Sequence, residues 1–504
     1  MTPTRRSVLL AVAGMLLVQA AWILALPPFR GMDEFDHVYR AYGVAHGQWQ
    51  LGDTDPRARG VLVEVPQDLV DAAAPQCESL QGIDPANCHE VGTTAGGTGD
   101  RALIGTTAGE YHPAFYWVVG TAADAFSGAA SLYAMRVAAA LLCALFFGLA
   151  LWGLVAAARP RGAWLALLAG LTPTLFYSTV VVAPNGLEMT AGLAAWCTLL
   201  SLFARGPEGP RARQETGLVV AAAAACGVVV TVRTLGPVWM LMIAVCVLLM
   251  AGAGAVARRV RARPALYAVA TVAVAAAGLG SAAWTYFSGL AGGSLGWTET
   301  PTGATETPGL LESLQLPLWT FQAIAAAPYR NNPAPAPVYL LFLLVLAVAL
   351  WLGWRDGSRR NRVATAVACV LGLLVPAVLV AATLSTWGGN WQGRYALPFL
   401  VGVPLLASWS APARAWAEPG RRRWVGLALV AAWVLANLLS VLHVRSSELG
   451  RAVSRDDSAW AHGPVLLTVA LAVLGGLCLA GALWSAGRGV REATPASSLV
   501  DAPA

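Results

Sequence analysis

The sequence contains no lysine, and charged residues of all kinds make up only 12% of its 504 positions. A water-soluble domain usually carries about 25% charged residues. Hydrophobic residues reach 57%, and the mean hydropathy is +0.60. This balance excludes an ordinary soluble enzyme. The net charge of +6 comes from arginines in short loops between apolar runs, so it does not indicate nucleic-acid binding.

Long apolar runs recur along the whole chain, and most approach the ~20 residues that a helix needs to cross a bilayer. They are rich in Leu, Ala and Val and lack the alternation of strands. Only helices and closed barrels satisfy their backbone amides in lipid, so the pattern predicts an all-α polytopic membrane protein with about 12 transmembrane helices. After a first span at 1–26, the predicted spans are 131–157, 163–181, 186–204, 217–235, 237–255, 265–287, 336–354, 363–384, 395–411, 424–443 and 463–485.

Arginines cluster in five of the loops between these spans. With twelve spans, all five loops fall on the side of the N-terminus, as the positive-inside rule requires. We therefore expect a multi-pass protein of the plasma (inner) membrane with both termini in the cytoplasm. Pro27 and Pro28 end the first helix, and no small-x-small cleavage site follows it. We interpret this helix as a retained anchor rather than a signal peptide.

The spans divide the chain into a first helix (1–26), an extracytoplasmic loop with an interfacial helix (27–112), a multi-helix transmembrane domain (113–485) and a cytoplasmic tail (486–504). We expect the tail to be disordered. The loop, at about 80 residues, is far longer than a connector needs to be. The apolar segment 112–127 has only about 16 residues, so we interpret it as re-entrant or interfacial.

Six of the eight cysteines lie within apolar runs, where a thiol behaves as a small hydrophobic group. Cys77 and Cys88 lie together in the long polar loop. In an exported loop they can form a disulfide, and two free thiols are the alternative. No CxxC pair or histidine cluster indicates a zinc site.

The densest polar cluster follows the first span, between Gly31 and Tyr42. In a helix, four of its polar residues share one face at spacings i, i+3, i+4 and i+7: Asp33, Asp36, His37 and Arg40. Such a helix, lying on the membrane by its apolar side chains, presents carboxylates and a histidine at the level of the lipid headgroups. The simpler alternative is an amphipathic helix whose charges are merely solvated.

This cluster and three later segments resemble the DUF2142 family of bacterial membrane proteins. The similar segments are Pro27-Pro28 followed by Asp33-Glu34, His37 and Arg40-Ala41-Tyr42; Tyr111 to Tyr116; Thr231-Val232-Arg233; and Gln392 to Pro398. The resemblance covers about residues 27–400. The chain departs from the family's pattern at His112, which stands in place of a Pro, and at Asn185, which stands in place of an Asp.

The family is grouped with the GT-C type glycosyltransferases, which use lipid-phosphate-linked sugars. The resemblance therefore implies a GT-C-like fold whose long first extracytoplasmic loop carries juxtamembrane helices. It also implies an enzyme that moves a sugar from a polyprenyl-phosphate donor to a cell-envelope glycan or glycolipid. In GT-C enzymes a carboxylate just past the first helix acts as base on the acceptor hydroxyl, usually with inversion. By this resemblance Asp33 is the expected base and Glu34 the second candidate.

The leaving phosphate needs cations, and Arg394, Arg233 and Arg330 are the candidates. The alternatives are interfacial anchoring for Arg394 and snorkelling for Arg233. Six further candidates can orient the base or line the pocket: Asp36, His37, Arg40, Tyr111, His112 and Glu188. Trp391 and Tyr395 complete the set, next to Arg394. For Glu188 the alternative is pairing with an arginine, for Tyr111 and His112 turn packing, and for Trp391 a place in the interfacial belt.

No cofactor is certain from the sequence, although Asp33, Glu34 and Asp36 can bind a divalent cation. The expected partners are a lipid-linked sugar donor, an envelope glycan acceptor and the lipid bilayer, with no nucleic acid. Two other functions remain open. One is a transporter or flippase of lipid-linked saccharide, which favours broken helices and internal repeats at mid-membrane. The other is a non-catalytic protein of envelope assembly.

Overall fold

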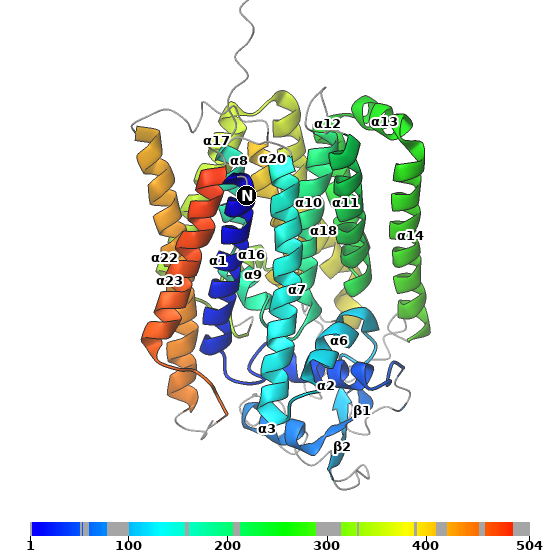
Figure 1. The fold of residues 1–504 in the computed structure, drawn as a ribbon, viewed down its shortest axis with the longest axis vertical. Coiled ribbons are helices and arrows are strands. Elements are labelled where there is room, and N and C mark those ends of the chain that lie inside the picture. Colours follow the sequence, from blue (N-terminus) through cyan, green and yellow to red (C-terminus); the bar gives the residue numbers. More distant parts are fainter. Residues whose placement is uncertain are drawn as a thin grey trace, which may run out of the picture.

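The computed structural model describes residues 3–50, 53, 60–77, 100–156, 161–204, 212–288, 314–329, 332–387, 391–409, 421–452 and 459–486. These residues form a bundle of long helices with a smaller polar cap at one end (Figure 1). Nine of the described helices are long and apolar enough to cross a membrane. They are α1 (Pro3–Ala25), α7 (Gly128–Ala156), α10 (Pro184–Phe203), α11 (Ala212–Val232), α14 (Pro264–Phe287), α17 (Ala336–Asp356), α18 (Arg359–Trp387), α22 (Arg421–Ala452) and α23 (Val465–Ala486).

Two of the twelve predicted spans are broken into short helices. The span predicted at 163–181 consists of α8 (Arg161–Gly170) and α9 (Pro173–Ser178). The break precedes Pro173, which lacks the amide hydrogen that would continue the helix. The span predicted at 395–411 consists of η3 (Gly393–Ala396), α19 (Leu397–Leu400) and α20 (Val403–Ser408), and it contains two further prolines.

A third predicted span, 237–255, is bent. Helix α12 (Gly236–Ala251) turns by 98° into α13 (Ala253–Ala262). The bend lies at Gly252, whose φ of +83° is a conformation that residues with a side chain rarely adopt. The described residues therefore hold nine straight spans, one bent pair and two broken segments where the sequence predicts twelve helices.

Helix α10 lies in the centre of the bundle, with 89% of its span buried. It packs against α7, α11, α12 and α19. Its contact with α19 is close because Gly192 has no side chain: a Cβ there would lie 2.3 Å from the carbonyl oxygen of Pro398. At the other extreme, α14 stands at the edge of the bundle with only 11% of its span buried (Figure 1).

Helices α1 and α23 form another close contact, which joins the two ends of the described chain. A Cβ on Gly14 would lie 2.7 Å from the carbonyl oxygen of Gly475. Small residues that let two backbones approach are a common basis of helix association in lipid. This contact holds α1, the helix that precedes the polar cap, against α23.

The polar cap follows α1 and contains elements that the sequence did not predict. Strands β1 (Val61–Pro66) and β2 (Arg101–Thr106) pair antiparallel, with Val61 opposite Thr106. Around them lie α2 (Glu34–Ala45), α3 (Gln67–Cys77), α6 (Pro113–Gly120) and η1 (Thr121–Ala123). With eight residues, α6 is too short to cross a bilayer. The segment 314–334 adds α16 (Leu316–Ile324), which packs against η3.

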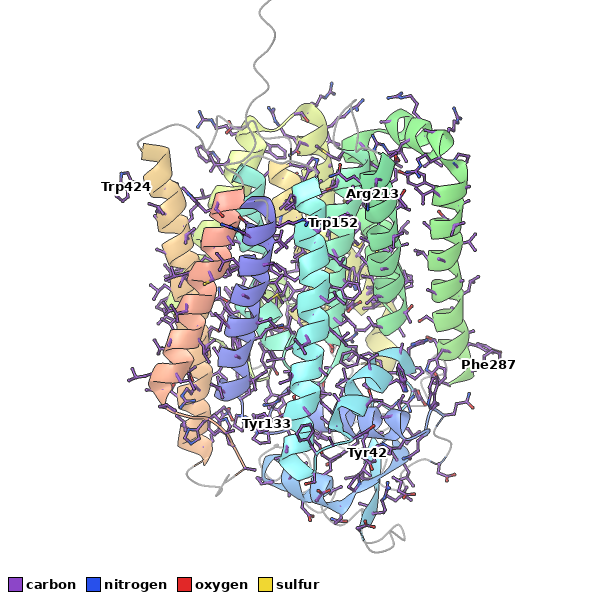
Figure 2. The ribbon with its side chains drawn as sticks, in the orientation of Figure 1. Tyr42, Tyr133, Trp152, Arg213, Phe287 and Trp424 are labelled. Carbon is purple, nitrogen blue, oxygen red and sulfur yellow. The ribbon has the colours of Figure 1, made fainter. Side chains whose placement is uncertain are left out.

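The cap and the N-terminus lie at opposite ends of the bundle (Figure 1). The arginine-bearing α13 lies at the same end of the bundle as the N-terminus. Figure 2 shows Tyr42, Tyr133 and Phe287 toward the cap, whereas Trp152, Arg213 and Trp424 lie toward the other end. The six cysteines of the apolar runs are free thiols. Cys88 and the side chain of Cys77 lie outside the described residues, and so does the tail 487–504.

Candidate functional site

Helix α2 begins at the junction between α1 and the cap, and ten of its twelve residues are buried. It packs mainly against α6, with β1 and β2 on another side. This differs from the expected amphipathic helix with one face on lipid and one in solvent. Protein covers both faces because α6, β1 and β2 pack against the helix. The polar side chains of α2 are therefore held in fixed positions.

Asp33 caps α2 at its N-terminus, with a left-handed backbone (φ +56°) and no capping hydrogen bond from its side chain. A non-glycine residue in this conformation carries backbone strain, and such residues cluster at functional sites. The side chain is 52% exposed, and its Oδ2 lies 3.4 Å from Nη2 of Arg394. The two residues are 361 positions apart. The fold thus brings together the first acidic residue of the cap and the start of the broken segment η3–α20.

Arg394 and Arg233 form a cationic surface around the ring of Tyr395. Their guanidinium carbons lie 5.6 and 4.9 Å from the centroid of that ring. Arg233 donates a hydrogen bond to Oδ1 of Asn185 (2.5 Å), and its Nε lies 3.9 Å from Glu188. Within the described residues, the buried Nε of Arg394 has no hydrogen-bond partner. Two guanidinium groups next to an exposed carboxylate can hold an anion such as a phosphate.

Glu188 is the acidic member of this cluster and is almost completely buried. One of its oxygens faces Arg233, and the other, Oε1, has no hydrogen-bond partner among the residues that the structure describes. Asn185 lies one turn earlier on α10, at a position where the sequence resemblance leads one to expect an Asp. Asn185 and Glu188 therefore approach Arg233 from one face of α10. The carboxylate of Glu188 lies beside the guanidinium, and the side-chain amide of Asn185 accepts a hydrogen bond from it.

His37 lies behind this surface in a group of aromatic rings. Its Nδ1 is 2.7 Å from the hydroxyl of Tyr116, and its ring packs against Tyr111 and Tyr116. Burial and the nearby charges of Arg233 and Arg394 lower the pKa of His37 to about 3. The imidazole is thus neutral at physiological pH and can orient a neighbour but does not supply positive charge.

Glu34 occupies a different environment from its neighbour Asp33. It is fully buried and forms an ion pair with Arg136 of α7, at 2.6 Å. Its two oxygens also accept hydrogen bonds from the amides of Gly31 and Val182. Arg136 donates in addition to the carbonyls of residues 26 and 27. Since every oxygen of Glu34 is engaged, we assign it a structural role instead of the second catalytic role that the sequence suggested.

Three other candidates hold the cap together. Arg40 is buried and donates to the carbonyls of Gln48, Trp49 and Tyr111. Burial lowers its pKa to about 10, so it remains charged at neutral pH. Asp36 accepts a hydrogen bond from the amide of Thr107. The Nδ1 atom of His112 accepts from the amide of Ala114 and caps α6. These contacts favour a structural role for all three over contact with a substrate.

The carboxylates of Asp33, Glu34 and Asp36 do not converge on one point, because each has a separate partner: Arg394, Arg136 or the amide of Thr107. Within the described part of the chain, no group of three His, Cys, Asp or Glu residues is placed to hold a metal ion. The divalent cation considered for these carboxylates therefore finds no preformed set of ligands here.

Trp391 belongs to an aromatic cluster. Its ring contacts those of Trp239, Trp319 and Tyr395, at centroid distances of 5.6 to 6.3 Å. Tyr111 is close to Arg233 as well as to His37, with the guanidinium 5.9 Å from its ring. Arg330 lies outside the described residues.

A small recess of about 10 Å³ opens beside Arg394. It is lined by Met32, Thr174, Gln322, Gln392 and Arg394, among others. A recess of this size has room for about one water molecule. A larger ligand does not fit within this recess.

Arg136 is the main residue of this region that the sequence analysis missed. It is the single charged residue within the 29 residues of α7. An ionisable residue inside an apolar span is expensive unless it has a partner, so its isolation was a usable signal. Tyr177 was also missed: its hydroxyl accepts from the amide of Met32 and donates to the carbonyl of Pro328.

The fold and this site define a polytopic helical membrane protein with an acid–guanidinium cluster, formed by Asp33, Asn185, Glu188, Arg233 and Arg394, at one end of its bundle. The chain belongs to the family described as predicted membrane protein (DUF2142), whose sequence profile matches residues 16–403. A comparison with curated proteins finds no match.

Solved structures similar to this chain include two of ArnT from Cupriavidus metallidurans, one in the apo state and one bound to undecaprenyl phosphate. Both are 16% identical to this chain, with a TM-score of 0.40. The apo structure match covers 93% of this chain and 74% of ArnT. For the bound structure these shares are 94% and 76%. At this TM-score, neither structure assigns a function to the chain.

The buried pair of Glu34 and Arg136 predicts a large loss of stability when one partner is removed. We expect Arg136→Gln to destabilise the protein by about 3–5 kcal/mol, because it leaves Glu34 buried without its counter-ion. The measurement is thermal unfolding in detergent. Arg101→Gln is the control, since its pair with Glu64 is 4.0 Å long and exposed, and it should cost no more than about 1 kcal/mol. Equal effects of the two variants would contradict the structural role.

The low pKa of His37 predicts that the stability of the folded protein depends on pH. Its pKa is about 3 in the folded protein and 6.5 ordinarily. The unfolded chain therefore binds more protons between these values, and stability falls as the pH drops from 6.5 toward 3. We expect Tm in detergent to decrease between pH 7.5 and pH 5, and to decrease less in His37→Gln. His462→Gln, at an exposed position, should keep the full decrease. A full decrease in His37→Gln would disprove the assignment.

Proposed function

We propose that this protein is a membrane glycosyltransferase that moves a sugar from a polyprenyl-phosphate donor to a cell-envelope glycan or glycolipid. The observation that carries the proposal is the contact between Asp33 and Arg394. One exposed carboxylate and two guanidinium groups lie within reach of a single small ligand. A sugar phosphate needs these two functions: a base for the incoming hydroxyl and cations for the leaving phosphate.

The orientation of the bundle supports an extracytoplasmic site. The arginine-bearing α13 lies at the same end of the bundle as the N-terminus, and the cap, which begins at Asp33, lies at the opposite end (Figure 1). By the positive-inside rule the arginine-rich end faces the cytoplasm. We therefore place the site on the outer side of the plasma membrane, with the N-terminus in the cytoplasm. A lipid-linked donor suits this side, because nucleotide sugars are not available there.

The proposed reaction is a single displacement at the anomeric carbon of the donor. Asp33 removes the proton from an acceptor hydroxyl, whose oxygen attacks the anomeric carbon. The bond from that carbon to the phosphate oxygen breaks, and the electron pair leaves with the polyprenyl phosphate. The proton stays on Asp33 until it is lost to solvent. Attack opposite the leaving group inverts the anomeric configuration.

In this reaction Arg394 and Arg233 stabilise the negative charge that develops on the phosphate. Both guanidinium groups lie close to the ring of Tyr395, and Glu188 and Asn185 contact Arg233. His37 is neutral and lies too deep to act as the cation. The pair of Arg394 with Asp33 also keeps the carboxylate oriented until a donor phosphate takes over the guanidinium.

Asp33→Asn tests the role of the base. The amide keeps the shape of the side chain but cannot accept the proton, so we expect turnover to fall by about 10²–10⁴-fold. The measurement is sugar transfer from a polyprenyl-phosphate donor by purified protein, together with donor binding. Binding should persist, because the guanidinium groups remain.

Asp124→Asn is the matched control, because Asp124 is also in the cap and its side chain is 55% exposed, close to the 52% of Asp33. It should leave turnover unchanged. Full turnover in Asp33→Asn would rule out this carboxylate as the base and favour a transporter or an assembly protein. A loss of donor binding in Asp33→Asn would show that the residue acts on binding instead.

Arg394→Lys tests the phosphate contact. Lysine keeps the positive charge but loses the planar fork of the guanidinium. We expect donor affinity to fall by about 10-fold, the effect of losing one hydrogen bond to a charged group. The measurement is the KM for the donor, and the acceptor KM serves as the internal control. A change in the acceptor KM alone would indicate that Arg394 contacts the acceptor and not the donor, and would contradict the phosphate contact.

A further inference from the structure

A second cavity lies at the other end of the bundle from Asp33. It has a volume of about 520 Å³, within the range of small-molecule sites. The ends of α10, α11, α12 and α18 form its walls, and α13 lies across it. No residue of the acid–guanidinium cluster contributes to it. The candidate site described above therefore does not explain this cavity.

The cavity has a positive charge. Three arginines line it, Arg258, Arg259 and Arg360, and none of them forms an ion pair within the part of the chain that the structure describes. The acidic residue of the lining, Glu215, is already engaged. Its Oε1 accepts a hydrogen bond from the hydroxyl of Tyr267 (2.7 Å), and its Oε2 lies 3.8 Å from Arg263. The charge of the three guanidinium groups is thus available to an anion.

Helix α13 presents two of these arginines to the cavity from one face. Ala255, Arg258, Arg259 and Ala262 all line it, at spacings i, i+3, i+4 and i+7. No residue of α13 is buried. The helix follows the 98° bend at Gly252 and so runs across the end of the bundle (Figure 1). A basic helix in this position lies at the level of the lipid headgroups.

The remaining walls are apolar. Phe203 at the end of α10 and Met250 at the end of α12 line the cavity below the arginines. A guanidinium cluster above an apolar wall matches an amphiphile with an anionic head. A free phosphate ion would engage the arginines but would gain nothing from Phe203 and Met250. Basic pockets between membrane helices on the cytoplasmic side bind anionic lipid headgroups.

We propose that this cavity binds the phosphate headgroup of an anionic phospholipid, with Arg258, Arg259 and Arg360 on the phosphate and the apolar wall against the start of the acyl chains. The site is separate from the proposed transferase site and does not depend on it.

The experiment measures lipid binding to the full-length protein in detergent, by native mass spectrometry during titration with phosphatidylglycerol. The wild type should bind it about tenfold more tightly than phosphatidylcholine. Arg258→Gln/Arg259→Gln/Arg360→Gln should lose about tenfold or more of this affinity. The control is Arg213→Gln/Arg261→Gln/Arg359→Gln, which removes the same charge from exposed positions outside the cavity. It should keep the affinity of the wild type.

A further variant, Ala255→Trp, fills the cavity without changing the charge and should also weaken phosphatidylglycerol binding. Equal losses in the two triple variants, or unchanged binding in Ala255→Trp, would overturn the site. So would equal affinity for the two lipids. Displacement of the lipid by glycerol phosphate at the same concentration would show a soluble phosphate ligand and overturn the lipid assignment. Asp33→Asn should bind phosphatidylglycerol like the wild type, which separates this test from that of the transferase.

Discussion

The buried ion pair between Glu34 and Arg136 is the contact on which the geometry of the candidate site depends. It joins α2 to α7, and the same two side chains bind the backbone at residues 26, 27, 31 and 182. The desolvation of two charges is repaid only when geometry and hydrogen bonds are nearly complete, as they are here. The preceding residue, Asp33, has a left-handed backbone, and its side chain is 52% exposed at the surface of the cap. Two adjacent carboxylates therefore have opposite environments, one buried and engaged and one exposed and available.

Much of the bundle could be predicted from hydropathy, because an apolar run of sufficient length has few other stable structures in lipid. Where prediction failed, the signals were proline and glycine. Pro173 and the prolines after Arg394 break two spans, and Gly252 bends a third. The strands of the cap carried a weaker signal. Val61, Val63 and Val65 alternate with less buried residues, but a single six-residue alternation within a long polar loop does not identify its partner strand.

The candidate site was harder to predict than the fold. The types of its residues could be chosen from the sequence, but the contact between Asp33 and Arg394 joins positions 361 apart and exists only once α2 and η3 are placed. The sequence also could not distinguish Asp33 from Glu34. Their environments differ because, in the folded protein, one side chain points to the surface of the cap and the other into the interior. The amphipathic pattern of α2 was misleading for a related reason. Asp36 and Arg40 are polar because they satisfy backbone groups of the cap, not because they face solvent.

Helices α10 and α11 connect the acid–guanidinium cluster to the arginine-lined cavity. The first turns of α10 carry Asn185 and Glu188, and its last residue, Phe203, lines the cavity. Arg233 follows the end of α11, and Glu215 lies near its start. Twenty helical residues span about 30 Å, so the two regions lie about one hydrocarbon thickness apart. Since α10 is buried along this length, it can hold the two regions at a fixed separation that matches the thickness of the hydrocarbon layer. The basic cavity and the folded cap therefore lie at opposite ends of one buried helix.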